Sequence, residues 1–485
     1  MRPRGHRLAA ALLAAIALPA LATPGVDEPP LPQPAQAIVV PAMVEQRLPN
    51  GLTLAVSERH DLPLVSALLL VRAGPEHDPP GRAGLATLTA TLLTKGAMRG
   101  KGPVPATVVA QQAEALGSVI DSASTWRAST LSMTVTSTKL PDALSLMADV
   151  LRRPTLAAEE LERARTLALD ALRVTMSDPG EVAGMAARRD WWGASPYGAS
   201  ATAASLARIT RQDVQRFHAQ AYRPEQTVLV LVGDITPPAA LALAARLLGD
   251  WRAAATPLPA VASPPPASAV PALVRIDMPG SGQCGVIVAA PFVASGAPER
   301  RIGQVANAVL GGGYSARLNQ KVRIERGLSY GASSQVETQP AGGVLVAVAQ
   351  TQHATAAEVL GLMRDEILHL AEAPLSADEL AARQATLTGS FARRMTSTSG
   401  LAALMVGQYA QGRSLDDLRR FVDEVMAVSA EQVRDFARQR WSPQALRAVV
   451  VGDLKAAGAA LEESGALSIP IDRLDIGQPG LVASK

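Results

Sequence analysis

Histidine, cysteine and carboxylate side chains bind most catalytic metals in proteins, and in this chain they are sparse. The sequence holds six histidines and a single cysteine, Cys284. Beyond His6, the histidines never pair at a metal-binding spacing; they are His60, His77, His218, His353 and His369. The densest cluster is Glu76-His77-Asp78, whereas a zinc site usually takes three or more well-spaced ligands. We therefore expect no metal and no cofactor in this chain, and one cysteine excludes an internal disulfide.

Three glycines, Gly311, Gly312 and Gly313, follow a predicted helix over residues 302–310. No Gly-Lys-Ser/Thr and no Rossmann spacing follows them, which disfavours a phosphate loop. They fit a helix C-cap with a turn that needs positive φ. Contact with a bound peptide is the alternative interpretation.

The N-terminus has the three parts of a secretory signal peptide. Three arginines precede an apolar run from Leu8 to Leu18, and Ala20-Leu21-Ala22 predicts cleavage before Thr23. The apolar run is far short of the roughly 20 residues that span a bilayer. We expect residues 1–22 to be removed. Export without disulfides suggests a periplasmic location.

Net charge gives no indication of a nucleic-acid partner. The chain has 46 Lys+Arg and 43 Asp+Glu, and losing the three arginines of residues 1–22 leaves 43 of each. A formally neutral mature chain lacks the basic character of a nucleic-acid-binding protein.

An internal repeat with an offset of 219 residues sets the architecture. Phe217 to Pro224 aligns with Phe436 to Pro443, and Val232-Gly233-Asp234 aligns with Val451-Gly452-Asp453. Each Val-Gly-Asp closes a β-branched run that is typical of a buried strand. A helix precedes it in each copy, with Thr210 or Ser429 as the expected N-cap.

The repeat and the proline-rich stretches divide the chain. We expect a proline-rich lead at 23–37, a first domain at 38–254, a linker at 255–271, a second domain at 272–470 and a tail at 471–485.

In the first copy, strands and helices interleave without strict βαβ alternation, so each domain should be α+β, a mixed sheet packed with helices. The expected strands are 52–56, 64–71, 118–121 and 129–135. The expected helices are 83–94, 106–116, 140–152, 157–176 and 183–193.

Residues 84–96 resemble the signature helix of the pitrilysin (insulinase-like) zinc metallopeptidases. In that family the helix carries H-x-x-E-H, a short apolar stretch and Lys-Gly. Aligning Lys95-Gly96 places Thr87 and Thr91 at the two histidines and Ala90 at the glutamate. Threonine is a poor zinc ligand and alanine cannot act as a base, so the resemblance implies a degenerate member. It covers about residues 45–455.

The family's third zinc ligand is a glutamate on a later helix. Depending on the alignment, that position falls on Ala168 or Ala171. Glu162 and Asp170 lie nearby, but lone carboxylates on an amphipathic helix are usually solvated surface charges.

The second half is similar to the family's second domain through residues 309–318 and 322–330. In the family an Arg and a Tyr seven apart face the zinc centre, and Arg323 and Tyr330 match them. The resemblance implies that both donate hydrogen bonds to a developing oxyanion. Otherwise Arg323 is an ion-pair partner of Glu325 or Asp365, and Tyr330 a half-buried strand residue. In related non-catalytic subunits the glycine-rich loop handles substrate.

The resemblance implies a non-catalytic subunit of a heterodimeric periplasmic zinc peptidase. A catalytic partner with H-x-x-E-H would hold zinc and the general base, and this chain would complete a peptide-binding chamber. A peptide-binding or scaffold protein without a peptidase role is the main alternative. An enzyme active alone would need ligands that the sequence does not show.

Overall fold

The computed structural model describes residues 38–100, 102–252, 256–257, 259–261, 272–462 and 466–482. Every helix and strand described lies in one compact unit, residues 40–485. The predicted signal peptide at 1–22, the lead at 23–37 and most of the predicted linker lie outside the described residues.

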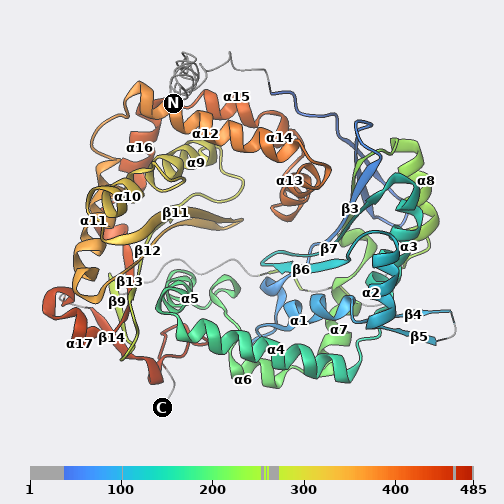
Figure 1. Cartoon of the computed structure of the whole chain (residues 1–485), viewed down its shortest axis with the longest axis horizontal. Coiled ribbons are helices and arrows are strands. Elements are labelled where there is room, and N and C mark those ends of the chain that lie inside the picture. The colour runs from blue at the N-terminus through green and yellow to red at the C-terminus, as the bar shows by residue number, and fades with distance from the viewer. Residues whose placement is uncertain are drawn as a thin grey trace, which may run out of the picture. The chain divides into compact units, whose positions relative to one another are not determined.

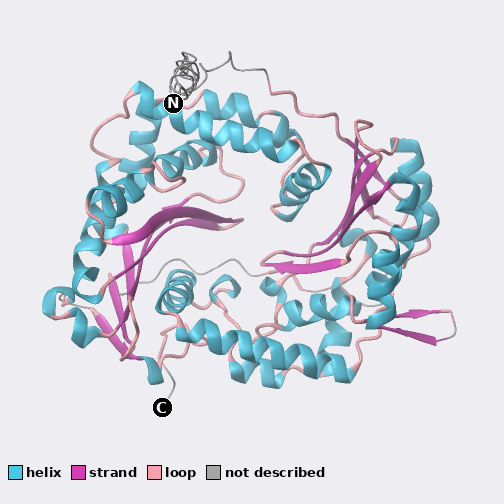
Figure 2. Cartoon of the chain, viewed as in Figure 1, coloured by secondary structure: helices cyan, strands magenta, loops and turns pink. Residues whose placement is uncertain are grey.

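Two six-stranded mixed sheets form the framework of this unit (Figures 1 and 2). The first has the order β1 (Val44–Arg47), β2 (Thr53–Glu58), β8 (Thr227–Gly233), β3 (Leu64–Val71), β7 (Ala128–Thr136) and β6 (Asp121–Thr125). The second, read from its opposite edge, has β14 (Leu467–Pro470), β9 (Leu273–Asp277), β13 (Arg447–Gly452), β10 (Cys284–Phe292), β12 (Gly342–Thr351) and β11 (Ser329–Gln339). The predicted α+β class with two tandem mixed sheets is confirmed.

The two sheets differ at one edge. β1 comes before β2 in the chain and pairs with it antiparallel, whereas β14 comes after β13 and pairs with β9 in parallel. The outer strand is thus added from opposite ends of the repeat. The other five strands follow one order, which is the expected result of a duplicated unit.

Helices pack against both sheets. Those of the first half are α1 (Leu85–Leu93), α2 (Ala106–Ala115), α3 (Leu140–Arg152), α4 (Ala158–Ser177), α5 (Pro179–Trp192), α6 (Ala203–Arg208), α7 (Arg211–Ala221) and α8 (Pro237–Leu248). Those of the second are α9 (Arg300–Leu310), α10 (Arg317–Asn319), α11 (Ala356–His369), α12 (Ala377–Met395), α13 (Thr398–Ala410), α14 (Asp416–Arg419), α15 (Phe421–Met426), α16 (Ala430–Arg440) and α17 (Leu454–Ala457). A small hairpin joins β4 (Gly96–Arg99) to β5 (Gly102–Pro105).

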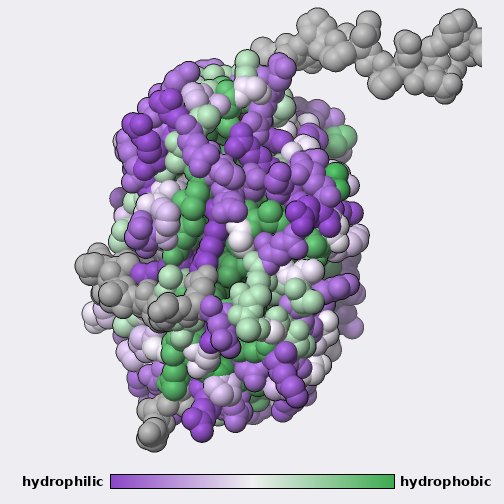
Figure 3. Space-filling view, turned by 90° about the vertical axis from the view of Figure 1, so that its left-hand side faces the viewer, coloured by the Kyte–Doolittle hydropathy of each residue, from purple (hydrophilic) through white to green (hydrophobic). Residues whose placement is uncertain are grey.

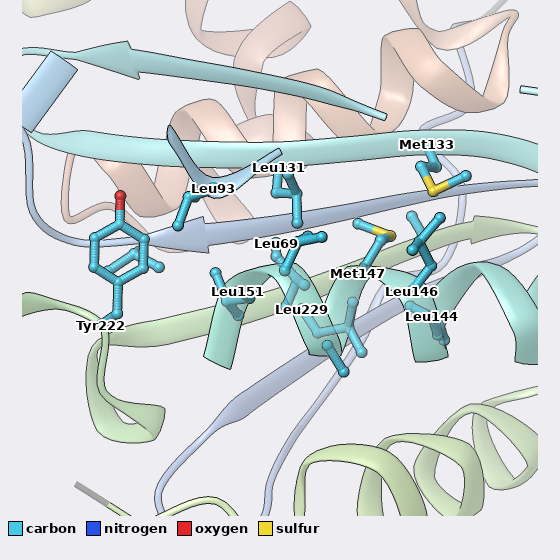
Figure 4. Packing of buried hydrophobic residues seen from close by; sticks show 14 of the residues in the cluster. Leu69, Leu93, Leu131, Met133, Leu144, Leu146, Met147, Leu151, Tyr222 and Leu229 are labelled. Carbon is cyan, nitrogen blue, oxygen red and sulfur yellow. The ribbon is translucent and has the colours of Figure 1, made fainter. Parts of the chain in front are cut away.

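The first core forms where α3 packs on the central strands. Leu69 of β3 lies in register with Leu131 of β7 on one side and Leu229 of β8 on the other, so three leucines line up across the sheet. Figure 4 shows Leu144, Leu146, Met147 and Leu151 of α3 beside them. All are buried, and burial of each such side chain contributes about 1.5–3 kcal/mol.

The two halves exchange one helix each. α5 from the first half packs on β10 and β13 of the second sheet, and α13 from the second half packs on β3 and β8 of the first. Val182, Ala183 and Ala186 of α5 share a buried cluster with Ile287 and Val449 of the second sheet. Each sheet therefore buries its second face only with help from the other half.

Local sequence explains where the exchanged helices begin. Asp178 accepts a hydrogen bond from the Glu181 backbone at 2.9 Å, and Pro179 occupies the first helical position, so α5 starts earlier than the predicted residue 183. Ser397 caps α13 through the Gly400 backbone at 3.0 Å. Residues of the predicted tail pack against α5, where Arg189 donates to the backbone oxygen of Ile476 at 2.9 Å.

The outer surface follows from these layers. In Figure 3, hydrophilic residues cover most of the face shown, and hydrophobic residues form narrow bands among them. This is typical of helices that bury one apolar stripe each. No helix in the described part of the chain is long and apolar enough to cross a membrane.

Candidate functional site

A cavity of about 1000 Å³ lies between α5 and the strands β11 and β12. Residues from α5, including Met185, Trp191 and Trp192, form one wall. The sheet provides apolar side chains such as Val344 and Val346 opposite them. Since α5 belongs to the first half, the cavity exists only because of the helix exchange.

Charged residues also line this cavity. Glu181 and Arg188 come from α5, and Glu337 comes from β11. Arg188 lies 3.9 Å from the Glu337 carboxylate and stacks over the Trp126 ring at 5.6 Å. A largely apolar cavity with a few fixed polar groups is the usual form of a ligand-binding site.

Tyr330 projects from the rim of the cavity with 89% of its surface exposed. The Arg323 guanidinium lies 4.8 Å from the centre of the Tyr330 ring and 5.1 Å from that of Tyr314. Within the described residues, the Arg323 side chain makes no ion pair and no hydrogen bond. Glu325, its predicted alternative partner, instead pairs with Lys321 at 3.0 Å.

The structure therefore brings Arg323 and Tyr330 together, and the two alternative structural interpretations of these residues are wrong. Tyr330 is not half-buried, and Arg323 is not a surface ion-pair partner of Glu325 or Asp365. Tyr314 is a third member that the sequence did not reveal, although it directly follows Gly313. An arginine between two aromatic faces keeps its N–H donors free at the ring edges for another acceptor.

Two backbone irregularities orient this group. Arg323 lies in η5 (Gln320–Glu325), a π-helical segment, and such segments are frequent at functional sites. The pairing of β11 with β12 shifts register between Ser329 and Ala332, so Tyr330 occupies a bulge. Bulges re-aim side chains, which explains why Tyr330 points away from the sheet.

The glycine run connects the end of α9 to this site. Gly311 caps α9, but none of the three glycines has positive φ, so that part of the prediction is wrong. A Cβ on Gly311 would lie 2.2 Å from the Ser334 nitrogen of β11, and one on Gly312 would lie 2.7 Å from the Ala308 Cα. Close backbone approach therefore excludes side chains at Gly311 and Gly312, whereas a Cβ on Gly313 would meet no heavy atom within 4 Å. All three glycines line the cavity.

Asn319 fixes the loop to the sheet. Its side-chain amide donates to the Tyr314 carbonyl at 2.6 Å and its oxygen accepts from the Ala332 backbone at 3.3 Å. The residue is buried, so these bonds hold Tyr314 and the bulge of β11 in one arrangement.

The degenerate zinc positions lie elsewhere, on α1, and none of them is among the residues described as lining the cavity. Thr87 is exposed, Ala90 is buried, and the Thr91 hydroxyl donates to the Thr87 carbonyl at 3.0 Å. This donor set does not fit zinc, because it offers no imidazole, thiolate or carboxylate. Among the residues that the structure describes, no group of three His, Cys, Asp or Glu could hold a metal ion.

The carboxylates near the third ligand position take surface ion pairs. Glu162 pairs with Arg165 at 3.1 Å and Asp170 pairs with Arg173, each within α4. The hydrogen bond from Arg165 lowers the pKa of Glu162, which keeps it charged. Ala168 and Ala171 lie on the same helix and provide no ligand atoms.

The Glu76-His77-Asp78 cluster is also structural. The Tyr197 hydroxyl donates to Glu76 at 2.8 Å, while Asp78 accepts from the Gly84 and Ala86 backbones at 2.7 and 2.8 Å at the start of α1. Burial raises the pKa of Asp78 to about 7. His77 Nδ1 lies 3.9 Å from the Glu76 carboxylate, but Asp78 is directed to the start of α1, so the three residues do not converge on one point.

One histidine lies between two carboxylates without forming a metal site. His60 Nδ1 lies 2.7 Å from Asp234, and His60 Nε2 lies 2.7 Å from Glu58. These hydrogen bonds, that to Asp234 first, raise the pKa of His60. The imidazole occupies the position between the carboxylates, where a metal would otherwise have to lie.

Comparison with protein families identifies the chain. Residues 54–204 match the model of insulinase, peptidase family M16, and residues 208–387 match the model of the peptidase M16 inactive domain. The chain belongs to this insulinase-like family, and its α1 helix makes it a degenerate member.

Individual relatives agree with that assignment. An uncharacterized zinc protease of Streptomyces coelicolor is 24% identical over 81% of this chain and 85% of its own length. A non-peptidase homologue of Helicobacter pylori is 22% identical over 82% of this chain and 91% of its own length.

Solved structures show the same fold. A peptidase M16 inactive domain from Pseudomonas fluorescens superposes with a TM-score of 0.78 at 24% identity, covering 84% of this chain and 98% of that one. A protease from Helicobacter pylori gives a TM-score of 0.78 at 16% identity, covering 85% and 100%. The chain is thus similar both to proteins named as proteases and to a homologue named as a non-peptidase.

Proposed function

We propose that this chain is the non-catalytic subunit of a heterodimeric zinc metallopeptidase. A partner of the same family, with an intact H-x-x-E-H helix, would hold zinc and the general base. This chain would complete the peptide-binding chamber and present Arg323 and Tyr330 to the partner's active site. In this proposal the chain is exported through its predicted signal peptide and meets its partner in the periplasm.

The exposure of Tyr330 is the observation that carries the proposal. A phenol ring that only stabilised the fold would be buried, because burying an aromatic side chain contributes several kcal/mol. Here the ring is 89% exposed and its hydroxyl has no hydrogen-bond partner among the described residues. The site thus retains donors without the groups that would perform hydrolysis.

The chemistry of the two donors suits peptide hydrolysis. Attack on a peptide carbonyl places negative charge on its oxygen, and positioned N–H and O–H donors stabilise that charge. The guanidinium provides N–H donors and a permanent positive charge, and the phenol provides one O–H donor. The rings of Tyr314 and Tyr330 limit the motion of Arg323, so less entropy is lost when it binds the oxyanion.

The edge of the second sheet provides a place for the peptide. Among the described strands, β11 pairs only with β12, and on its other side the Ser334 N–H donates to the Gly311 carbonyl at 3.1 Å and the Ala332 N–H to the Asn319 side chain at 3.3 Å. A peptide could therefore add only along the rest of this edge. An extended peptide can add to such an edge through main-chain hydrogen bonds. The neighbouring cavity, with Trp191 and Trp192, would accept apolar side chains of that peptide.

A peptide-binding or scaffold protein with no peptidase role remains the second candidate. The α1 helix without metal ligands fits it as well, and so does the similarity to a homologue named as a non-peptidase. A scaffold, however, gains nothing from an arginine and an exposed tyrosine held together at a cavity rim. An enzyme active alone would need a metal group that the described residues do not offer.

The proposal is tested by purifying the tagged chain from its native cell envelope and identifying stoichiometric partners by mass spectrometry. We expect a subunit of similar size with an intact H-x-x-E-H helix, and zinc only in the complex. The purified chain alone should contain no stoichiometric zinc and cleave no peptide. Metal-dependent cleavage by the pure chain would overturn the proposal.

A further inference from the structure

A second cavity, of about 510 Å³, lies where α9 meets the segment that contains α14 and α15. None of its lining residues also lines the first cavity. Of the described residues around it, four are arginines and two are carboxylates. They are Arg300, Arg301, Arg413, Arg420, Asp417 and Glu424.

The two carboxylates are already used by three of the arginines. Asp417 lies 2.7 Å from Arg300 Nη2 and 2.9 Å from Arg301 Nη2. Glu424 lies 2.8 Å from Arg301 Nε and 3.0 Å from Arg420 Nε. Arg413 makes no ion pair in the described part of the chain, although the charge of Asp417 acts on it, and the residues lining the cavity keep a formal surplus of two positive charges.

Two of these arginines also carry unused donors. Arg300 is only 6% exposed, yet its Nε and Nη1 have no hydrogen-bond partner among the described residues, and neither has the buried Nε of Arg413. A buried donor without a partner destabilises the folded chain, and more so when the donor is charged. Arg301, by contrast, uses all three nitrogens, on Glu424, Gln304 and Asp417.

Repulsion between the arginines is a further sign of the excess positive charge around this cavity. Burial, followed by the charge of Arg300 and to a lesser extent that of Arg301, lowers the pKa of Arg413 to about 10, against the opposing attraction of Asp417. A protein seldom holds like charges in a buried cluster without a counter-ion. The residues that line the cavity thus carry more positive than negative charge.

We propose that this cavity binds a small oxyanion of charge −2, of the phosphate or sulfate class. A dianion matches the surplus charge of the four arginines and two carboxylates, whereas a peptide carboxylate would neutralise only half of it. Tetrahedral oxyanions accept several hydrogen bonds at once, and guanidinium groups fit their edges with paired N–H donors. The volume accommodates such an ion with its remaining water.

The binding site is independent of the peptidase proposal, because it needs neither a partner chain nor the Arg323–Tyr330 pair. It would link the second domain's stability to the anion supply of its compartment. An anion that binds only the folded state stabilises it in proportion to the logarithm of its concentration.

Calorimetric titration of the full chain with inorganic phosphate, at constant ionic strength set with chloride, tests the site. We expect saturable binding to the unchanged chain and an about tenfold or greater loss of affinity in Arg413→Gln, the value of one charge-assisted hydrogen bond. Arg413→Gln should fold, because the Arg413 side chain makes no hydrogen bond and no ion pair among the described residues. Sulfate, titrated in the same way, shows which dianion binds more tightly.

Arg438→Gln is the matched control. Arg438 lies on α16, is 70% exposed, makes a long ion pair of 3.9 Å with Asp435 and is not among the residues that line the cavity. Its affinity for phosphate should equal that of the unchanged chain. The proposal is overturned if neither dianion binds saturably, or if Arg413→Gln and Arg438→Gln bind phosphate equally well.

Discussion

Replacing Gly285 of β10 by alanine should loosen the exchange of helices between the two halves. A Cβ at this position would lie 2.4 Å from the Pro179 carbonyl oxygen and 2.7 Å from the Gly180 backbone, both at the start of α5. Ordinary contact begins at 3.4 Å, so α5 must retreat by about 1 Å. Backbone atoms cannot rotate aside as a flexible side chain can.

The cost follows from what α5 buries. Its Val182, Ala183 and Ala186 pack with the second sheet, and moving them forfeits contacts all along that interface. Overpacking of this kind typically destabilises a protein by about 1–3 kcal/mol. The same shift displaces Trp191 and Trp192, so it should also alter the first cavity.

Urea denaturation followed by tryptophan fluorescence measures this effect. Gly285→Ala should unfold at a lower urea concentration than the unchanged chain, with a changed fluorescence of the native state. Gly282→Ala is the control, because a Cβ there meets no heavy atom within 4 Å. Equal midpoints for the two variants would refute the close packing of α5 on β10.

Four further substitutions test the description of α1 and of the charged surface. Ala90→Glu should destabilise the chain by several kcal/mol, because Ala90 is 1% exposed. Thr87→Glu, at an exposed position, should change the unfolding free energy by no more than about 0.5 kcal/mol, and similar melting temperatures for the two variants would contradict this prediction. Asp78→Ala removes two hydrogen bonds from the start of α1 and should lower the unfolding free energy by about 1–3 kcal/mol in urea titrations; an unchanged value would show that this cap is dispensable. His60 should titrate by NMR with a pKa above the 6.5 that is ordinary for histidine, so the stability it contributes is complete below pH 6.5 and is lost as pH rises through the folded-state pKa. His60→Gln should flatten this pH dependence of the unfolding free energy, and a His60 pKa at or below 6.5 would refute the prediction.

The repeat was the most informative feature of the sequence. Thr210 and Ser429, 219 residues apart, both form capping boxes, and their helices lead into β8 and β13. Caps and strand ends are local properties, so side-chain types at fixed spacing predict them well. The sheet order then follows from duplication rather than from any single segment.

Other features depend on contacts that no local pattern contains. The predicted strand at 118–121 is wrong, because β6 runs over Asp121–Thr125 and Gly117, with a φ of +75°, ends the preceding turn. Periodicity predicted the helix near 183–193 but not that it packs on the other half's sheet. An amphipathic stripe shows that a helix is buried on one face, not which partner covers it.

Some residues of the candidate site could likewise be predicted from the sequence, and others could not. Arg323 and Tyr330 were predicted from a resemblance, and the structure adds that Tyr314 completes the stack around the guanidinium. The anion cavity had no counterpart in the sequence, because Arg300 and Asp417 meet only in the folded chain, 117 residues apart. Charged residues scattered along a sequence give no sign that they will converge.

Peptide cleavage by the purified complex, with the unchanged chain and with Tyr330→Phe, tests the central claim most directly. The substitution removes only one hydroxyl from a ring that is 89% exposed, so folding and assembly should be unaffected. We predict a fall in kcat of about ten- to a thousandfold, as when an oxyanion donor is lost. An unchanged kcat would contradict the claim that this chain contributes to its partner's active site.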